Sequence, residues 1–231
     1  MSFFRLLGAI AKKRLTPEQP KPVRTKVPLR LSQSSAVEIS IVPMVLAENA
    51  GALFGSNLAE RHTIVAVGQF SLFGIDITRA YLSQDPGAYL HFATHGSAIV
   101  ESRLYRPYDE VIPATGEEWA FWLDQADGYI GYPIMQSKDD DGQQQYSRSW
   151  SPGETRINPF EVIEKITDAV GNTTVVQHQM MHYSRAMAGD VPEHLLVSAA
   201  ATADGMSVNL WLGINLVPHD LTIFPSLDAP Q

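Results

Sequence analysis

The sequence predicts an α+β protein that is mostly β, in which antiparallel meander sheets form either a sandwich or an open, barrel-like structure. From about residue 36 onward, short runs of β-branched and aromatic residues alternate with tight turns. The turns follow one another at intervals of roughly 20 to 30 residues, which suits hairpins and leaves little room for crossover helices. We therefore expect antiparallel strands with one or two short helices among them.

Each predicted hairpin joins two strand-forming runs at a turn that contains glycine. Glycine supplies the positive φ that tight hairpin turns require, and Asp-Gly is among the strongest hairpin dipeptides. The predicted turns lie at Phe73-Gly74, His95-Gly96, Asp141-Gly142, Gly171-Asn172 and Asp204-Gly205.

Two stretches compete with the strand pattern as helices. Residues 116–127 start with Glu117 and Glu118, lack β-branched residues and predict a short helix. Residues 158–170 start with Asn158 and Pro159, which fit the first positions of a helix. Because they run into a Gly-Asn turn and a β-rich partner, the hairpin is the favoured interpretation of this second stretch.

The chain divides into a basic amphipathic helix over residues 1–15, a proline-rich linker over 16–35 and a single β-rich domain over 36–231. At about 100° per residue, the apolar side chains of the first segment fall within one arc of a helix. The prolines from Pro17 onward cannot continue that helix. We expect docking on an anionic membrane or on a partner, with packing on the protein's own body or in a homo-oligomer as the alternative. The docking residues would be Phe3, Phe4, Leu6, Leu7, Ile10, Lys12, Lys13 and Arg14.

Charge is distributed unevenly along this chain, whose net charge is −8. Residues 1–30 carry eight basic side chains and one acidic one, a net +7, so the remainder has 9 basic and 24 acidic side chains, a net −15. A basic tail on an acidic body is typical of a segment that contacts something anionic. The acidic body argues against nucleic acid as the partner, because phosphate binding needs a cationic surface.

The composition also predicts a cellular setting. No apolar run is long enough for a spanning helix, and the absence of cysteine suits a reducing cytoplasm. In the first segment the charges follow the apolar residues, which is the wrong order for a secretory signal. We expect a cytoplasmic protein.

The seven histidines raise the question of a metal site. His91 and His95 have the spacing that chelates zinc on a helix, and so do His178 and His182. Both pairs fall in predicted strands, where four residues span about 13 Å, so we expect no shared metal ion and no cofactor. A calcium loop starting at Asp139 would lack its twelfth, acidic ligand. The nucleophile elbow, the phosphate-binding loop and the dinucleotide fingerprint are also missing.

Large aromatic side chains gather in the middle of the chain. They would line a ligand pocket or a partner surface, or else fill the core, as large aromatics commonly do. The candidate pocket residues are Trp119, Trp122, Tyr132 and Trp150.

Four stretches resemble the YjfK-like family of bacterial proteins, whose function is unknown. They are VGQFSLFGIDITRAYLSQD, EEWAFWLDQADGYIGYPIMQSKDDDGQQQYSRSW, MMHYSRAM and HLLVSAAATADGMSVNLWLGINL. The likeness covers roughly residues 36–224 and includes no catalytic signature, so it implies no site residue. It implies a bacterial cytoplasm and, as a partner, a PspA-like membrane-remodelling protein of the envelope stress response.

These observations favour a non-enzymatic adaptor or interaction protein, related to envelope stress and peripheral at the inner face of the cytoplasmic membrane. A small-molecule or lipid-binding β-rich module is the alternative, and it requires a cavity among the central aromatics. A metal-dependent hydrolase that uses His91, His95, His178 or His182 is the least favoured interpretation.

Overall fold

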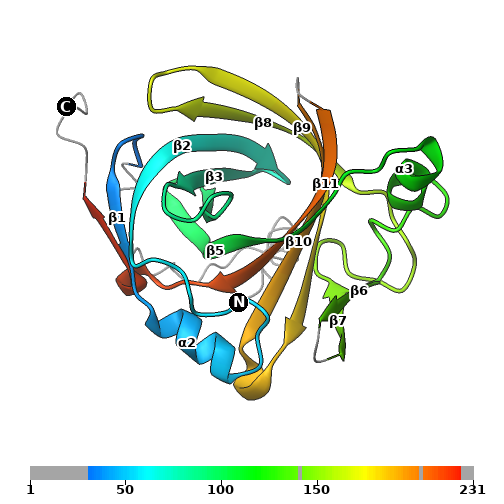
Figure 1. Cartoon of the computed structure of the whole chain (residues 1–231), viewed down its shortest axis with the longest axis horizontal. Helices are drawn as coiled ribbons and strands as arrows, with labels where there is room; N and C mark the ends of the chain where they lie inside the picture. Colours follow the sequence, from blue (N-terminus) through cyan, green and yellow to red (C-terminus); the bar gives the residue numbers. More distant parts are fainter. Residues whose placement is uncertain (1–30, 140–141, 203–204, 225–231) are drawn as a thin grey trace, which may run out of the picture.

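The computed structural model describes residues 31–139, 142–202 and 205–224, and its main feature is a closed barrel of eight antiparallel strands (Figure 1). The first half of the barrel consists of β2 (Arg61–Leu72), β3 (Ile75–Leu82), β4 (Tyr89–His95) and β5 (Ala98–Val111). The second half consists of β8 (Phe160–Asp168), β9 (Thr173–Ala186), β10 (Pro192–Thr202) and β11 (Gly205–Asn215). The predictions of a mostly β chain and of antiparallel meanders are confirmed.

Two strand pairings close the barrel, and both join its first half to its second. At one seam β5 pairs with β11, with Tyr105 opposite Gly213. At the other β2 pairs with β8, with Gly68 opposite Ile166. Around the barrel the strand order is therefore β2-β3-β4-β5-β11-β10-β9-β8. Of the two architectures that the sequence left open, the structure has the barrel, and it is closed.

The predicted hairpins are present. At the β2–β3 turn, Phe73 and Gly74 both have positive φ, 55° and 74°, as a two-residue hairpin turn of this hand requires. The turns between β4 and β5 and between β8 and β9 also lie at the expected glycines. Residues 140–141 and 203–204 lie outside the described part of the chain, but the strands on either side of them pair as predicted.

The two stretches in which helix and strand competed have the structures that the sequence favoured. Phe160–Asp168 is strand β8, and Gly116–Leu123 is helix α3. The start of α3 is capped, since the Thr115 hydroxyl accepts a hydrogen bond from the backbone N–H of Glu118 (3.2 Å). The Glu118 carboxylate in turn accepts one from the backbone N–H of Ala114 (2.6 Å).

A second helix, α2 (Val42–Asn49), was not predicted. Pro43 lies in its first turn, a position that proline favours. Gly51 follows its end with a φ of 90° and continues the chain in a conformation that suits glycine. Met44 and Ala47 bury one side of this helix.

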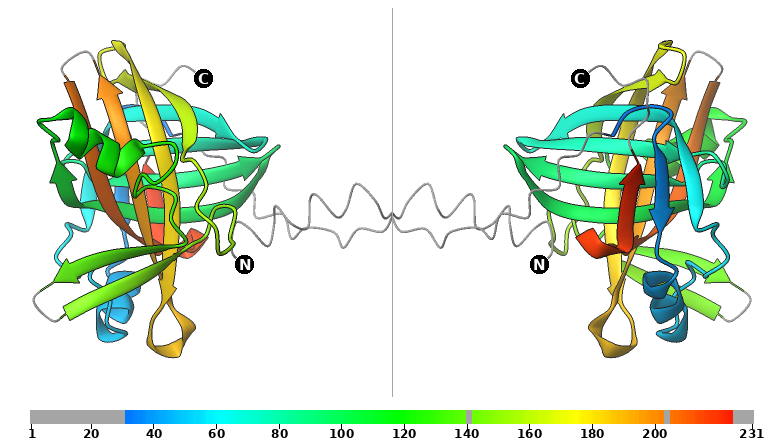
Figure 2. Two further views of the ribbon diagram at one scale, coloured as in Figure 1. Left: turned by 90° about the vertical axis from the view of Figure 1, so that its right-hand side faces the viewer. Right: turned by 90° about the vertical axis from the view of Figure 1, so that its left-hand side faces the viewer.

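The remaining elements lie outside the barrel (Figure 2). The short strand β1 (Ala36–Ile39) pairs with β2 and with β12 (Leu221–Phe224). The hairpin of β6 (Ile134–Asp139) and β7 (Gly142–Arg148) touches the barrel where β7 pairs with β9. Single 3-10 turns are found at Ala188–Asp190 and Pro218–Asp220.

A buried carboxylate, Glu193 of β10, anchors these outer elements. It accepts hydrogen bonds from the backbone N–H of Phe54, which follows α2 (2.9 Å), and from the hydroxyl of Tyr146 on β7 (2.7 Å). Arg185 of β9 donates its Nε–H to the same carboxylate at 2.8 Å. A charge held by three donors is a stable way to attach two elements to the outside of a barrel.

The outer elements give the barrel strands a second buried face. Successive side chains of a strand point to opposite faces, so every second residue points away from the barrel interior. In β4 and β10 these outward side chains are apolar and fully buried, and runs of consecutive residues are therefore buried. The buried outward side chains of the barrel include Leu90, Leu104, Leu195, Val197 and Leu212.

The described chain starts at Leu31, within the predicted linker. Ser34 donates its backbone N–H to the carbonyl of Ile64 (2.9 Å), and Ser35 is fully buried. The predicted helix over residues 1–15 and the linker up to residue 30 lie outside the described residues.

Candidate interaction surface

The interior of the barrel is polar. Strand register places Arg79 opposite His91 and His91 opposite Arg103, so these three side chains share the inward face of β3, β4 and β5. Each is at most 4% exposed. Burying two guanidinium groups is costly unless they find charged or hydrogen-bonding partners, and the interior supplies such partners.

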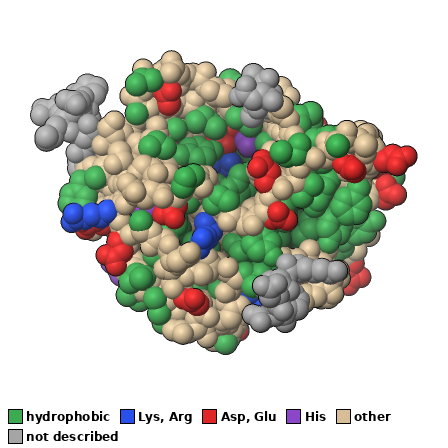
Figure 3. All heavy atoms as spheres, viewed as in Figure 1, with side chains coloured by type: hydrophobic (Ala, Val, Ile, Leu, Met, Phe, Trp, Pro, Cys, Tyr) green, Lys and Arg blue, Asp and Glu red, His purple; other side chains and the backbone are tan. Residues whose placement is uncertain are grey.

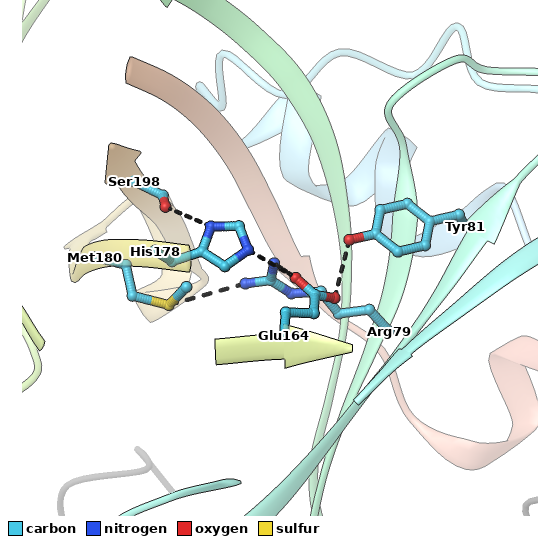
Figure 4. A network of polar contacts seen from close by, with 6 residues as sticks. All are labelled: Arg79, Tyr81, Glu164, His178, Met180 and Ser198. Carbon is cyan, nitrogen blue, oxygen red and sulfur yellow. Dashed lines mark hydrogen bonds and ion pairs between the residues drawn. The ribbon is translucent and has the colours of Figure 1, made fainter. Parts of the chain in front are cut away.

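Arg79 lies at the centre of the network in Figure 4. Its Nη1 donates to Glu164 of β8 at 2.8 Å, and the other carboxylate oxygen of Glu164 accepts from the hydroxyl of Tyr81 at 2.9 Å. The guanidinium also lies over the rings of Phe70 and Tyr89, each 4.9 Å away. The ion pair therefore crosses the interior from β3 to β8.

Both charges of this pair are retained despite burial. Burial alone would raise the pKa of Glu164, but Arg79, His178 and Tyr81 together lower it below the ordinary value. Burial alone would lower the pKa of Arg79, and the Glu164 charge raises it instead. Burial raises the pKa of Tyr81, which stays a hydroxyl donor.

One hydrogen-bonded row of side chains, formed by Ser198, His178 and Glu164, resembles the catalytic triad of a hydrolase. The Nδ1 atom of His178 lies 3.0 Å from the Ser198 hydroxyl, and its Nε2 lies 3.0 Å from Glu164. Ser198 is fully buried in the middle of β10, whereas a nucleophile must be open to substrate. Burial also lowers the pKa of His178. We interpret the row as structural.

A second cluster surrounds Arg103 of β5. Its Nη1 donates to Nε2 of His182 at 3.1 Å, and its Nε donates to Asn215 at 3.3 Å. His194 donates from Nε2 to the same amide oxygen at 2.9 Å. Burial, followed by the neighbouring Arg103, lowers the pKa of both His182 and His194 well below 6.5. These histidines are neutral at pH 7.

Of the four histidines considered as metal ligands, three lie inside the barrel and His95 is exposed at the end of β4. Within the described ranges, no group of three or more His, Cys, Asp or Glu residues is placed to hold a metal ion. His178 and His182 form hydrogen bonds with protein groups, and the ring of His91 packs edge-on against Tyr105.

One aromatic cluster lies on the outside, on α3 and the loop that follows it. We call this surface the α3 face; its residues are Trp119, Phe121, Trp122, Tyr129 and Tyr132. The ring of Phe121 stacks on that of Tyr129 (5.3 Å between centroids), and its edge meets Trp122 (5.2 Å). Phe121 is 58% exposed and Tyr132 is 38% exposed. Trp119, Trp122 and Tyr129 are partly buried and pack against the core, so the exposed aromatics of this face are Phe121 and Tyr132. Exposed apolar side chains that lie together mark an interaction site in many soluble proteins.

The loop beneath this surface is held in place by Arg156. Its guanidinium donates to three backbone carbonyl oxygens, those of Asp124 (2.5 Å), Gln125 (2.7 Å) and Gly128 (2.7 Å). The Tyr129 hydroxyl accepts a hydrogen bond from the backbone N–H of Gln136, the third residue of β6, at 3.0 Å. The loop backbone and the Tyr129 ring are thus held in position without any partner.

Acidic side chains border the α3 face. They are Glu117, Glu118, Asp124 and Asp127, all exposed. Figure 3 shows the broad hydrophobic area over α3, at the right of the view, with acidic side chains along its outer edge. Hydrogen bonds from the backbone N–H groups of Ala126 and Asp127 lower the pKa of Asp124, so its charge persists at mildly acidic pH.

The structure separates the four candidate pocket aromatics. Trp119, Trp122 and Tyr132 belong to the α3 face. Trp150 is only 3% exposed and packs with Phe73 and Phe160 at the barrel end near the β2–β3 turn. There it fills the interior.

The predicted docking residues Phe3, Phe4, Leu6, Leu7, Ile10, Lys12, Lys13 and Arg14 lie outside the described residues. Among the described residues no helix is both long and apolar enough to cross a membrane.

Sequence reasoning missed the interior ion pair. A signal was available in the period-2 pattern, because Arg79 shares its strand face with Ile75 and Ile77. Likewise Glu164 shares a face with Val162. A charge on an apolar strand face indicates a buried partner.

The comparisons identify the family. Residues 4–222 match the model of a family described as a protein of unknown function, DUF2491, and the chain belongs to that family. No curated protein and no solved structure matches the chain.

Proposed function

We propose that this chain is a non-enzymatic interaction protein that binds a protein partner through the α3 face. The observation that carries the proposal is the exposure of Phe121 on α3 and of Tyr132 after the adjoining loop, which Arg156 already holds in place. Aromatic side chains with fixed positions lose little freedom on binding and supply much of the energy of an interface. The acidic border favours a partner segment that is basic as well as apolar.

A photocrosslinking experiment tests this proposal directly. A photoreactive phenylalanine derivative replaces Phe121 in the full-length protein within its native cells. The expected adducts lie in a basic, apolar segment of one partner. The matched control places the same group at Val170, which is 82% exposed on the turn between β8 and β9. Equal adduct formation at the two positions would contradict the proposal.

Matched substitutions give a second measurement. Crosslinking identifies the partner, and co-purification then measures its binding to each variant. We expect Phe121→Asp to abolish co-purification of this partner and Val170→Asp to leave it unchanged. Both side chains are mostly in water, so neither change removes core packing. Unfolding curves of the two variants check that the barrel is intact in both.

The resemblance noted in the sequence suggests a first candidate partner, a PspA-like membrane-remodelling protein, and with it a role in envelope stress. Calorimetric titration of that purified protein with the wild type and with Phe121→Asp tests the suggestion. We expect binding to the wild type alone. Absence of heat with the wild type would remove this candidate partner.

Residues 3–14 supply a second attachment in this proposal, to an anionic membrane surface at the inner face of the cytoplasmic membrane. Each basic residue near such a surface contributes about 1 kcal/mol. We therefore expect Lys12→Glu combined with Lys13→Glu to weaken sedimentation with anionic vesicles at least tenfold. Neutral vesicles are the control, and equal sedimentation of wild type and variant would contradict membrane attachment.

A second candidate function, binding of a small polar molecule inside the barrel, is favoured by one observation. Since Arg103 can only donate, His182 accepts at Nε2 and carries its proton on Nδ1. This Nδ1, together with Nδ1 of His194 and the Tyr89 hydroxyl, is buried and has no hydrogen-bond partner among the described residues. Native mass spectrometry of the purified protein tests for a retained ligand, and an unliganded mass counts against this function.

A further inference from the structure

We propose that residues 3–14 dock on the α3 face of the same molecule and occupy it until a partner or an anionic surface displaces them. The inference rests on the proposed function, because it concerns the same face. It adds a form of regulation: the protein would carry its own competitor for the partner site.

Another exposed apolar surface within the described part of the chain competes with the α3 face for the segment. It is the outer side of α2 with the residue before it, where Ile41 is 39%, Val42 55%, Val45 38% and Leu46 58% exposed. The only acidic residue of α2 is Glu48, and it already accepts a hydrogen bond from Ser56. This surface offers apolar area but little charge for a segment that carries Arg5, Lys12, Lys13 and Arg14.

The α3 face matches the segment in both respects. Its rings offer apolar area to Phe3, Phe4 and Leu7, and its border carries four acidic residues. The nearest basic side chain in the described loop, Arg156, is engaged with backbone carbonyl oxygens and with the Asn158 side chain (2.9 Å). Opposite charges at the border raise the association rate and fix the orientation, while the aromatic centre supplies the affinity.

The connecting chain is long enough. Sixteen residues separate Arg14 from Leu31, the first described residue, and an extended chain of that length spans about 50 Å. A domain of about 190 residues has a radius of gyration of about 16 Å. Such a domain is about 40 Å across, so most of its surface is within reach of the linker. Tethering makes the contact intramolecular, with an effective concentration in the millimolar range for a short linker.

The absence of cysteine allows a direct test on the full-length chain. Spin labels at Ala9→Cys, on the polar side of the predicted helix, and at Gln125→Cys, next to the α3 face, report their separation by pulsed electron resonance. We expect a narrow population of short distances. A control pair at Ala9→Cys and Val170→Cys should give no such population, because the β8–β9 turn lies away from α3 (Figure 1).

Matched variants separate docking from incidental proximity. Phe3→Asp with Leu7→Asp, or Glu117→Lys with Asp127→Lys, should each abolish the short-distance population. Phe3→Leu and Glu60→Lys are the corresponding controls and should retain it; Glu60 is exposed next to β2. A broad distribution that is the same in the wild type and in Phe3→Asp would overturn the proposal.

Mixing two singly labelled chains identifies the occupant. Short distances between Ala9→Cys of one chain and Gln125→Cys of another would place the segment on a second copy and overturn docking within one molecule. A narrow intramolecular distance in the wild type, with no crosslinked partner at position 121 even in the Phe3→Asp, Leu7→Asp variant, would contradict the proposed function alone. Loss of the short distance on adding anionic vesicles or the crosslinked partner segment supports displacement, and its persistence with both contradicts it.

Discussion

The guanidinium of Arg79 and the carboxylate of Glu164 meet at 2.8 Å inside the barrel, although 85 positions separate them in the sequence. Both side chains are at most 2% exposed. Together with Tyr81 and His178, they connect the first half of the barrel to the second across its interior.

Removing one charge of this pair should destabilise the protein strongly. We expect Glu164→Gln to lower the free energy of unfolding by about 3–5 kcal/mol, because it leaves the Arg79 charge buried without compensation. The combined change Arg79→Met and Glu164→Met should cost much less than the sum of the single changes. Urea unfolding measures all three. Arg61→Met, which removes the exposed pair with Glu38, serves as the control and should change stability little.

Gly68 should tolerate no side chain. A Cβ atom there would lie 1.9 Å from Oε1 of Glu164 and 3.2 Å from the Tyr81 ring, and Glu164 is held by hydrogen bonds on both oxygens. We expect Gly68→Ala to cost about 1–3 kcal/mol. Gly116→Ala, where nothing lies within 4 Å of the added atom, is the matched control. A Gly68→Ala unfolding midpoint equal to that of the wild type would show that Glu164 can move.

Stability should fall as the pH drops below 6.5. Burial lowers the pKa of His91, His182 and His194 well below 6.5 in the folded state, so the unfolded chain takes up protons first. Each such histidine contributes a slope of about 1.4 kcal/mol per pH unit. Glu164, whose pKa is lowered, adds a further loss below pH 4.5. Urea unfolding between pH 7.5 and 4.5 measures the slope.

Two variants test the origin of this pH dependence. His91→Phe removes one of four interior histidines whose pKa burial lowers, and it should reduce the slope between pH 6.5 and 5 by about a quarter. His95→Asn, which replaces an exposed histidine at the end of β4, is the matched control. A slope that is unchanged in His91→Phe would exclude the interior histidines as its cause.

Arg156 should order the α3 face without supporting the barrel. We expect Arg156→Met to increase amide hydrogen exchange in residues 124–129, because three backbone carbonyl oxygens lose their donor. Exchange in β10 and β11 should stay as in the wild type. If both regions exchange faster, the loop is part of the global folding unit instead.

The local parts of this fold could be predicted from the sequence, whereas its closure could not. Turn dipeptides such as Phe73-Gly74 act through their own backbone preferences, so hairpins are visible in a short stretch. The pairing of β5 with β11 depends on residues about a hundred positions apart, such as Tyr105 and Gly213. Nothing within either strand specifies the other. The helix α2 was missed although Pro43 and Gly51 mark its ends, because strand-rich neighbours dominated the interpretation.

The candidate site could also be predicted only in part. The aromatic content of residues 116–132 is evident from the sequence, but exposure decides whether aromatics fill a core or form a surface. Trp150 and Phe121 belong to the same aromatic-rich part of the chain, and only tertiary packing sends the first inside the barrel and the second to the surface.

The two seams have a consequence for how such a barrel is constructed. Each half is a four-stranded meander, and the first strands of the halves pair with each other, as do the last strands. This is the connectivity of two half-barrels related by a dyad and fused through the segment that carries α3. A chain cut within that segment would keep both seams, so its two fragments should reassemble into the barrel. The linking segment is therefore free to vary for recognition while the dyad-related halves keep the scaffold.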